Sequence, residues 1–332
     1  MVVTSHDVAR LAGVSQPTVS RALRDSPKVS AATRRRVREA ASALGYVPSE
    51  TGRALSSGRT RRIGLLLTDL ENQFYPHVIA PMHRELEALD YQLVLHTESS
   101  DTGRVAERLV ANGLDGVLFA TTTLDSVLPV RLRDRAVPFV YFNRTSESVE
   151  ADSAEVDAGS GMRELAARML ALGHRRVGAV FGPQNTSTAG NREGALRDAL
   201  ATSSVGISPE LSLRGPFDVG TGHTGARRLL QHPNPPTVIV CGNDVVAFGA
   251  LNAARELGVD VPGEVSVVGF DDLPAARWPL VQLTTVAFDL DAMARRAASL
   301  LVERIETGPV AGYRHEWFPS RLVERGTLAA AP

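Results

Sequence analysis

The sequence predicts a small all-α head of the helix-turn-helix type, followed by an α/β body built on parallel sheets. Three observations support this prediction. A glycine separates two short helix patterns near the N-terminus, basic residues gather in the first 62 positions, and apolar runs alternate with amphipathic stretches after them. At 332 residues the chain exceeds one ordinary core, so we expect one small domain and a larger body.

The net charge of −1 conceals two parts of opposite sign. Residues 1–62 hold 12 Lys and Arg against 4 Asp and Glu, which leaves 24 basic and 33 acidic residues for the rest of the chain. A segment of +8 attached to a body of −9 indicates that the first part meets a polyanion. The preference for arginine over lysine reflects either codon composition or selection for forked contacts.

The stretch DVARLAGVSQPTVSRAL predicts two short helices. Thr4 and Asp7 form a capping-box pattern, and the apolar stripe of the first helix is predicted to hold Val8, Leu11 and Ala12. Gly13 ends this helix. Ser15 is a good N-cap for a second helix over residues 16–23, where Pro17 falls in the first turn and costs little.

A third helix is predicted from the cap at Ser30 to Gly45, with an inner face of Val37, Ala40, Ala41 and Leu44. Three short helices joined by a Gly-containing turn match a helix-turn-helix module, whose second helix enters the major groove of DNA.

This run, with KVSAATRRRVREAASALGYVPS after it, closely resembles the DNA-binding module and linker of LacI-family (LacI/GalR) transcriptional regulators. The resemblance implies that Gln16, Pro17 and Arg21 read bases, although the Pro17 ring offers apolar contact alone. It also implies backbone-phosphate contacts by a set of polar side chains: Thr4, Ser15, Thr18, Ser20, Thr33 and Tyr46.

Residues 48–61 (PSETGRALSSGRT within them) have weak helix propensity, which is typical of a flexible linker. In the resembled family this segment is a hinge helix that orders on DNA and wedges a leucine into the minor groove. Leu55 holds that position, with Arg53 and Ala54 beside it. Glu50 and Gly52 depart from the family pattern, so we expect the hinge to disorder readily.

The body, residues 62–332, shows apolar runs typical of seven buried strands: IGLLLT, YQLVLH, GVLFA, VPFVYF, RVGAVFG, TVIVCG and EVSVVGF. Their alternation with amphipathic helices predicts right-handed βαβ units. Seven strands can form one wide sheet. The resemblance instead implies a periplasmic-binding-protein-like body of two doubly wound subdomains, with crossings near Ala158, Phe288 and Pro319. The N-subdomain is then residues 62–157 and 289–319, and the C-subdomain 158–288 and 320–332, after a DNA-binding domain of residues 1–47.

In parallel sheets, ligands bind beyond the carboxyl ends of the strands. Polar and aromatic residues follow several predicted strands, among them Asn72, Tyr75, Arg144 and Thr188. Carboxylates, amides and arginine among aromatic faces suit a small polyhydroxylated or heterocyclic ligand. The resemblance singles out seven positions as effector-facing: Asp69, Phe74, Asn143, Arg192, Phe217, Asn243 and Asp271. Asp244 and Asp272 are interpreted as helix caps.

Catalytic interpretations find little support. No G-x-S-x-G, Walker-type loop or dinucleotide motif follows a strand, and the histidines have no metal-ligand spacing, so we expect neither an enzyme nor a cofactor. His223, within GTGHTG, is interpreted as a surface residue. The single cysteine, Cys241, is interpreted as a buried strand residue.

We therefore expect a DNA-binding transcriptional regulator, a repressor whose affinity for a near-palindromic operator is controlled by a sugar-like effector. A head that covers one half-site predicts a homodimer, and the C-terminal RGTLAAAP carries no heptad helix for tetramers. Without a signal peptide or an apolar run long enough to span a bilayer, a cytoplasmic location is expected. The alternatives are a solute-binding transport protein, and an architectural DNA-binding protein without an effector.

Overall fold

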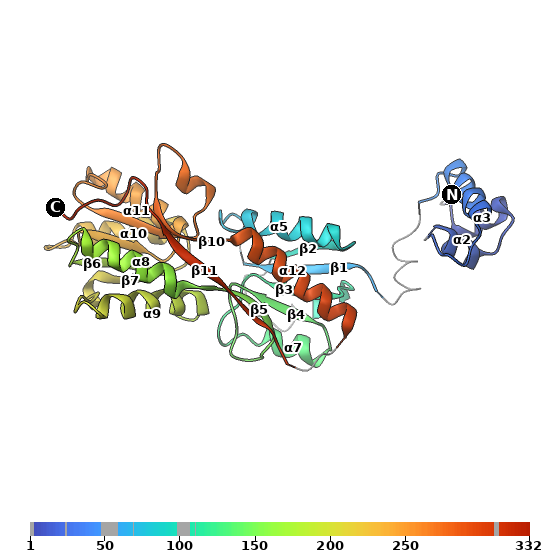
Figure 1. Ribbon diagram of the computed structural model, residues 1–332, viewed down its shortest axis with the longest axis horizontal. Coiled ribbons are helices and arrows are strands. Elements are labelled where there is room, and N and C mark those ends of the chain that lie inside the picture. Colours follow the sequence, from blue (N-terminus) through green and yellow to red (C-terminus); the bar gives the residue numbers. More distant parts are fainter. Residues whose placement is uncertain are drawn as a thin grey trace. The chain divides into compact units, whose positions relative to one another are not determined.

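The structure is a computed structural model that describes residues 3–23, 25–47, 59–68, 70–97, 107–109, 111–308 and 312–332. The chain divides into two compact units, which we call the head (Met1–Thr60) and the body (Arg61–Pro332). Both are drawn in Figure 1, and each is described by itself.

The head contains the three predicted helices, α1 (Ser5–Ala12), α2 (Gln16–Leu23) and α3 (Ala31–Ala43). Thr4 starts α1, since its N–H and its hydroxyl donate to the Asp7 carboxylate at 3.0 and 2.7 Å. Gly13 ends α1 in the left-handed conformation, with φ of 64°. This conformation favours glycine, which explains why the chain breaks at that residue.

The helices of the head pack around a small core of valine and alanine. Val8, Val19 and Val37 are fully buried, one from each helix. The prediction that Leu11 faces inward is wrong, because Leu11 is 57% exposed and Ala9 is buried in its place. At 100° per residue, positions 8, 9 and 12 share one face of α1, and position 11 falls to its side.

The third helix agrees with its prediction. The Ser30 hydroxyl accepts the Thr33 N–H at 3.2 Å, which caps α3, and Val37, Ala40 and Ala41 form its buried face. Leu44, at the end of α3, packs partly buried against the same core.

The body is built on one eleven-stranded sheet of order β2-β1-β3-β4-β5-β11-β10-β9-β8-β6-β7. The seven predicted strands are β1 (Arg62–Leu67), β2 (Gln92–Thr97), β3 (Gly116–Phe119), β4 (Phe139–Phe142), β6 (Val177–Phe181), β8 (Val238–Cys241) and β9 (Ser266–Phe270). The sequence interpretation missed four more: β5 (Asp152–Asp157), β7 (Ser212–Arg214), β10 (Thr284–Phe288) and β11 (His315–Val323). In the described part of the sheet, β10 and β11 pair antiparallel and the other neighbours pair parallel.

Strand β11 joins the two sides of this sheet. Up to Pro319 it pairs with β5, and from Ser320 it pairs with β10 (Figure 1). We call the strands β2, β1, β3, β4 and β5 the N-side, and the strands β10, β9, β8, β6 and β7 the C-side. Strand β5 continues directly into helix α8 at Ala158, so the chain also crosses there.

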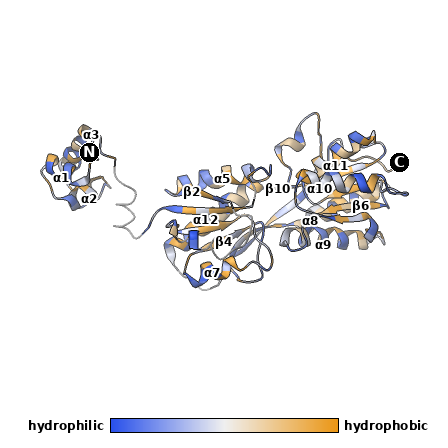
Figure 2. Cartoon of the chain, turned by 180° about the vertical axis from the view of Figure 1, so that it is seen from behind, coloured by the Kyte–Doolittle hydropathy of each residue, from blue (hydrophilic) through white to orange (hydrophobic). Residues whose placement is uncertain are grey.

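Helices cover both faces of the sheet. On the N-side, α5 (Tyr75–Ala88) and α12 (Leu290–Thr307) lie on one face and α7 (Leu128–Asp134) on the other (Figure 1). On the C-side, α10 (Val219–Leu230) and α11 (Asp244–Leu257) lie opposite α8 (Ala158–Ala171) and α9 (Ser187–Ala201). Short 3₁₀ turns are η1 (Pro209–Leu211) and η2 (Pro274–Arg277). Figure 2 shows the apolar colouring gathered along the strands, which are the centre of each layered side.

Helices α10 and α11 approach each other through glycine. A Cβ on Gly222 would lie 1.9 Å from the Val246 carbonyl oxygen, and one on Gly249 would lie 2.0 Å from the Val219 carbonyl oxygen. Larger side chains would therefore force these two helices apart.

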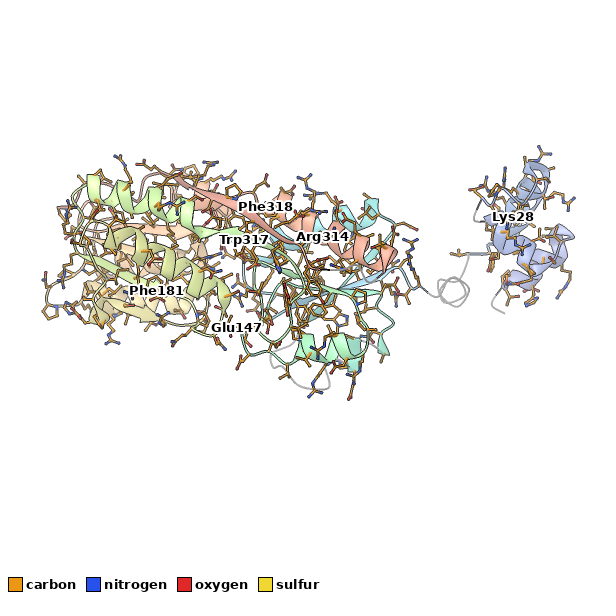
Figure 3. All side chains as sticks on the ribbon, turned by 60° about the horizontal axis from the view of Figure 1, so that its bottom comes forward. Lys28, Glu147, Phe181, Arg314, Trp317 and Phe318 are labelled. Atoms are coloured by element: carbon orange, nitrogen blue, oxygen red, sulfur yellow. The ribbon has the colours of Figure 1, made fainter. Side chains whose placement is uncertain are left out.

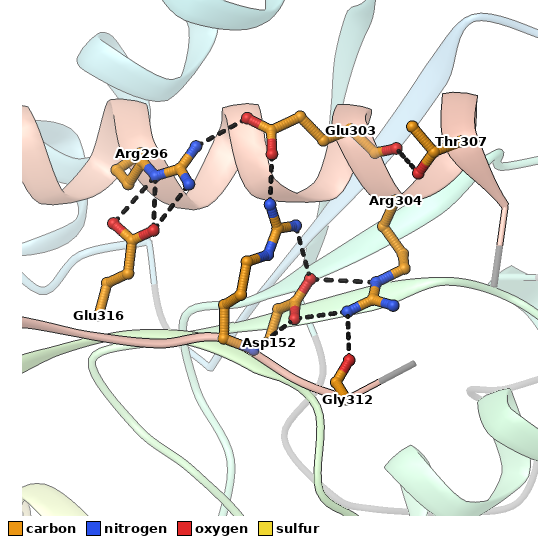
Figure 4. A network of polar contacts seen from close by, with 8 residues as sticks. Asp152, Arg296, Glu303, Arg304, Thr307, Gly312 and Glu316 are labelled. Atoms are coloured by element: carbon orange, nitrogen blue, oxygen red, sulfur yellow. Dashed lines mark hydrogen bonds and ion pairs between the residues drawn. The ribbon is translucent and has the colours of Figure 1, made fainter. Parts of the chain in front are cut away.

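A network of ion pairs fixes the outer end of the N-side (Figure 4). Asp152, on β5, is almost fully buried and accepts from Arg304 of α12 at 2.6 Å and from Arg314, just before β11, at 3.0 Å. Burial raises the pKa of Asp152, but the two guanidinium groups outweigh it and hold that pKa below its ordinary value. The network ties β5, α12 and β11 together.

No helix in the described ranges is long and apolar enough to cross a membrane.

Candidate functional site

We call the region where the carboxyl ends of the N-side and C-side strands meet the cleft. Strands β1 and β4 end there on one side, and β6, β8 and β9 on the other. Three hydrogen bonds cross between the sides: Asn72 Nδ2 to the Phe217 carbonyl oxygen (2.7 Å), the Leu124 N–H to the Asn185 carbonyl oxygen (2.9 Å), and the Thr145 N–H to Ser187 Oγ (2.9 Å). The two sides are therefore in contact around the cleft.

The centre of the cleft is an ion pair between Arg192 of α9 and Asp271, which follows β9. Arg192 Nη2 lies 2.8 Å from Asp271 Oδ1, and the two side chains are 6% and 2% exposed. Arg192 Nη1 donates to the Gly242 carbonyl oxygen at 2.8 Å, and its guanidinium lies 3.9 Å from the centre of the Phe270 ring. The contacts hold the guanidinium in one position.

Burial raises the pKa of Asp271 to about 6, although Arg192 acts to lower it. Desolvation disfavours the carboxylate more than the guanidinium stabilises it. Asp271 therefore keeps an acceptor oxygen that gains from a further hydrogen-bond donor.

Asn143 and Arg144 follow β4 and face the cleft from the N-side. Asn143 has φ of 63°, and its N–H donates to the Ala154 carbonyl oxygen at 2.8 Å. Its Oδ1 is buried without a hydrogen-bond partner. The guanidinium of Arg144 lies 5.4 Å from the centre of the Phe217 ring, and burial lowers the pKa of Arg144.

Thr188 contributes a second buried oxygen without a partner, Oγ1, from the C-side. It lies one turn before Arg192 on α9, so the two side chains share a face of the helix. A buried polar atom without a partner costs about 1–3 kcal/mol. Two such atoms, one from each side of the sheet, indicate a place where a polar ligand completes the hydrogen bonding.

Phe217 closes the C-side of the cleft. Its ring packs where a Cβ on Gly182 would stand, 2.1 Å from the nearest ring atom, and it also lies 5.9 Å from the Arg192 guanidinium. Gly182 follows β6, so the absence of a side chain there makes room for the ring.

The remaining predicted effector positions fall in different places. Phe74 is buried in the main core, with its ring 5.8 Å from that of Tyr75. The Asn243 side chain caps α11 by accepting the Val246 N–H at 2.9 Å. Asp69 lies outside the described residues.

The interpretation of Asp244 and Asp272 as helix caps is wrong. Asp244 lies inside α11, where its buried carboxylate accepts from the Leu273 N–H (2.7 Å) and the Thr285 hydroxyl (2.5 Å). Asp272 pairs with Arg277 and Arg325. Asn243 holds the capping geometry because it is the last extended residue before α11.

The predicted DNA-contacting residues of the head lie on α2 and around it. Ser15, Pro17 and Arg21 are exposed, and Gln16 and Thr18 are half-buried. The Ser15 and Thr18 hydroxyls are 2.9 Å apart, and Gln16 Nε2 donates to Ser5 Oγ of α1 at 3.3 Å. Ser20, Thr33 and Tyr46 are half-buried, Tyr46 against the core of the head. The hinge positions Arg53, Ala54 and Leu55 lie outside the described residues.

Two residues of the cleft, Arg144 and Thr188, were named after their strands but not selected in the sequence interpretation. Arg144 directly follows Asn143 at a strand end, and Thr188 precedes Arg192 by four residues, which is one helical turn. Their spacing from the selected residues could therefore have identified both as site residues. Cys241 is buried on β8, and burial raises the pKa of its thiol. His223, on α10, lies 2.8 Å from Glu256.

Comparison with known proteins identifies the family of the chain. The family model for bacterial regulatory proteins of the lacI family matches residues 4–49, and a periplasmic binding protein-like domain model matches residues 166–328. The HTH-type transcriptional regulator MalR of Streptomyces coelicolor is 35% identical over 98% of this chain and 96% of its own length.

Two solved structures are similar over nearly the whole chain. The complex of the transcriptional regulator CelR with cellobiose is 30% identical, with a TM-score of 0.75, and covers 98% of this chain and 100% of its own. The lac repressor dimer bound to operator and the anti-inducer ONPF is 25% identical, with a TM-score of 0.87, and covers 99% and 100%. With a helix-turn-helix head, a two-sided body and a relative of 35% identity along its length, the chain belongs to the LacI family of bacterial transcriptional regulators.

Proposed function

We propose that this protein is a repressor whose affinity for a DNA operator is controlled by a small sugar-like effector bound in the cleft of the body. The observation that carries the proposal is the pair of buried oxygens without partners, Asn143 Oδ1 on the N-side and Thr188 Oγ1 on the C-side, together with the buried Arg192–Asp271 ion pair.

A sugar suits this arrangement because each of its hydroxyl groups both donates and accepts. Hydroxyl groups of the sugar can donate to Asn143 Oδ1, Thr188 Oγ1 and the second carboxylate oxygen of Asp271. Their oxygens can accept from Arg144 and Arg192. Phe217 supplies the apolar face against which a ring packs. The solved CelR complex, which contains cellobiose, supports this class of ligand.

The head reads DNA, in this proposal, through Gln16, Pro17 and Arg21 at the start of α2. Both Pro17 and Arg21 are exposed, and the apolar side of α2 is occupied by the core of the head. One head spans one half-site, so specific binding requires a homodimer on a near-palindromic operator. The solved lac repressor, a dimer on operator, supports this arrangement.

Coupling between the sites follows from the crossing segments of the body. We treat residues 62–157 with 289–319, and 158–288 with 320–332, as two subdomains that close on the effector. The ligand touches both, so its binding changes their relative position, and the change reaches the hinge at residues 48–61. Ligand and operator affinities are then reciprocally coupled, typically by about 1–3 kcal/mol.

Neither alternative accounts for all these features. A transport-type solute-binding protein has no use for a helix-turn-helix head of +8. An architectural DNA-binding protein leaves the buried cleft oxygens without a purpose.

The test uses the full chain and a Thr188→Val variant. Because Thr188 Oγ1 has no partner, removing it keeps the shape of the side chain and does not weaken the fold, so the melting temperature should hold or rise. An operator is first selected from random DNA by the wild-type chain. Its affinity is then measured with and without saturating maltose, cellobiose and other sugars.

We expect one of the sugars to change operator affinity by about fivefold or more, and Thr188→Val to need a higher concentration of that sugar for the same effect. Ser204→Ala, on an exposed turn after α9, is the matched hydroxyl control. A change of less than about twofold with every sugar would refute control by a sugar. Selection of no DNA sequence would refute the regulator itself.

A further inference from the structure

Outside the cleft, helices α8 and α9 border a groove of about 630 Å³ on the outer face of the C-side. Its walls are two facing stripes, Gly159, Arg163 and Ala167 on α8, and Asn191, Ala195 and Asp198 on α9. Gly159, Ala167 and Ala195 have small side chains, so little side-chain volume projects into the groove between the two helices.

The groove crosses the boundary between the two sides of the sheet. One end is formed by Val156 and Asp157, at the end of β5, and by Trp317 on the part of β11 that pairs with β5. Trp317 and Phe318 are adjacent on β11 and labelled in Figure 3. Phe318 packs against the main core, whereas Trp317 is 55% exposed.

Three polar side chains of the groove lack partners, in contrast to the cleft ion pair. The side chains of Arg163, Asn191 and Asp198 make no hydrogen bond or ion pair with any described residue, whereas Asp157 Oδ1 accepts the Gly159 N–H at 2.9 Å. The Arg163 guanidinium lies above Gly159, where a Cβ would stand 2.9 Å from Nη1 and 3.0 Å from Asp157 Oδ1. A cation and a carboxylate thus face the same space beside an exposed indole.

We propose that this groove is a second ligand site, which binds a neutral saccharide. The apolar face of a pyranose ring packs on the Trp317 indole, and its hydroxyl groups bond to Arg163, Asn191 and Asp198, which offer both donors and acceptors. Two carboxylates, Asp157 and Asp198, face one guanidinium, so the charge of the groove disfavours an anionic ligand. The open shape admits a disaccharide lying along the helices.

A saccharide in the groove would contact both sides of the sheet at the crossing point. It would therefore bind one relative position of the two sides better than another and bias the closure of the cleft. The groove shares no residue with the cleft, so saccharide binding there does not depend on the function proposed above, whereas its effect on closure of the cleft rests on that function.

The test uses Trp317 as its own reporter, because the chain has two tryptophans. The full-length Trp278→Phe/Arg192→Ala chain retains Trp317 and lacks the cleft guanidinium. Glucose, maltose and cellobiose are titrated separately, and the Trp317 emission is recorded. We expect a saturable change with at least one of the three sugars.

Arg163→Gln and Asp198→Asn, added to that chain, should each weaken the response about tenfold or more, since each removes a hydrogen bond to a charged group. Arg168→Gln is the matched control, because Arg168 lies on the same helix but outside the groove and pairs with Glu324. Thermal melting verifies that each variant is folded.

A response that groove variants leave unchanged would assign the signal to another site and overturn the proposal. No response to any of the three sugars in the folded chain would also overturn it. Should Arg192→Ala destabilise the chain too far, Thr188→Val takes its place, and the same two outcomes apply.

Discussion

Replacing Arg192 by methionine should destabilise the body through the charge that it leaves behind. Asp271 is 2% exposed and pairs with Arg192 at 2.8 Å. Removing one partner of a buried ion pair costs about 3–5 kcal/mol, because the remaining carboxylate stays buried without compensation. In a body of this size that cost lowers the melting temperature by about 6–15 °C.

The double variant Arg192→Met/Asp271→Leu separates the stranded charge from the loss of packing. It removes both charges, so most of the stability should return. The Gly242 carbonyl oxygen, which accepts from Arg192 at 2.8 Å, still loses its donor, and about 1–3 kcal/mol of destabilisation should remain. Neither variant should respond to effector, since both lack the guanidinium.

The pH dependence gives an independent check. The folded-state pKa of Asp271 is about 6, above its ordinary value of 3.8, so its contribution to stability is greatest at low pH and is lost as pH rises toward 6. Arg192 lowers this pKa, so the folded-state pKa of Asp271 is higher still in Arg192→Met. The variant therefore goes on losing stability to a higher pH than the wild-type chain does. The cost of Arg192→Met should therefore be small below about pH 6 and grow above it.

The assay is thermal melting of the full chain between pH 5 and 8, with Arg168→Met as control. Arg168 pairs with Glu324 on the surface, where both side chains are more than 40% exposed, so its loss should cost less than about 1 kcal/mol. The reasoning is wrong if the double variant is no more stable than Arg192→Met, or if the cost of that variant does not change with pH.

Four further predictions concern other parts of the chain. Arg21→Ala should weaken binding to the selected operator by about 1–3 kcal/mol in titrations, with no change in melting temperature, because Arg21 is exposed on α2; an equal loss on random DNA would contradict base reading. Leu280→Asp, at a position 98% exposed, should shift the chain from dimer to monomer in sedimentation if this loop lies in the dimer contact, and an unchanged mass would exclude the loop. His174 is fully buried, and burial lowers its pKa below 6.5. Its contribution to the stability of the fold is therefore fully present above pH 6.5 and should be lost as the pH falls below that value. His174→Gln should reduce this dependence of the melting temperature on pH. Gly222→Ala, whose Cβ would meet the Val246 carbonyl oxygen at 1.9 Å, should lower the melting temperature by several degrees, and a neutral result would show that α10 can shift.

Six of the seven strands predicted from the sequence are buried on both faces. β1, β3, β4, β6, β8 and β9 read as continuous apolar runs because helices cover both sides of a parallel sheet. Strand β5, DSAEVD, is just as buried but carries Asp152 and Glu155. Arg304 and Arg314 compensate the buried charge of Asp152, and both come from more than 150 residues away along the chain. Such pairing leaves no local signal.

The ends of elements were harder to predict than the elements themselves. Asn243 and Asp244 are adjacent, and either residue type can cap a helix. The choice depends on where β8 ends and on Leu273 and Thr285, which supply donors to the Asp244 carboxylate. The cleft positions could be predicted because strand ends converge whatever the details of their caps.

Several features that are unfavourable for folding lie together in the cleft. Asn143, Asp271 and Asp272 have positive φ angles of 63°, 112° and 53° at the ends of β4 and β9. Two oxygens are buried without partners and one carboxylate is held above its ordinary pKa in the same region. Residues in strained or unpaired states persist where the surrounding structure fixes them, and they gather at functional sites. A ligand that donates to these oxygens would remove part of the cost only in the folded chain, so the effector should raise the melting temperature as well as change operator affinity. The same sugar should lose both effects together in Thr188→Val, because both arise from one set of hydrogen bonds.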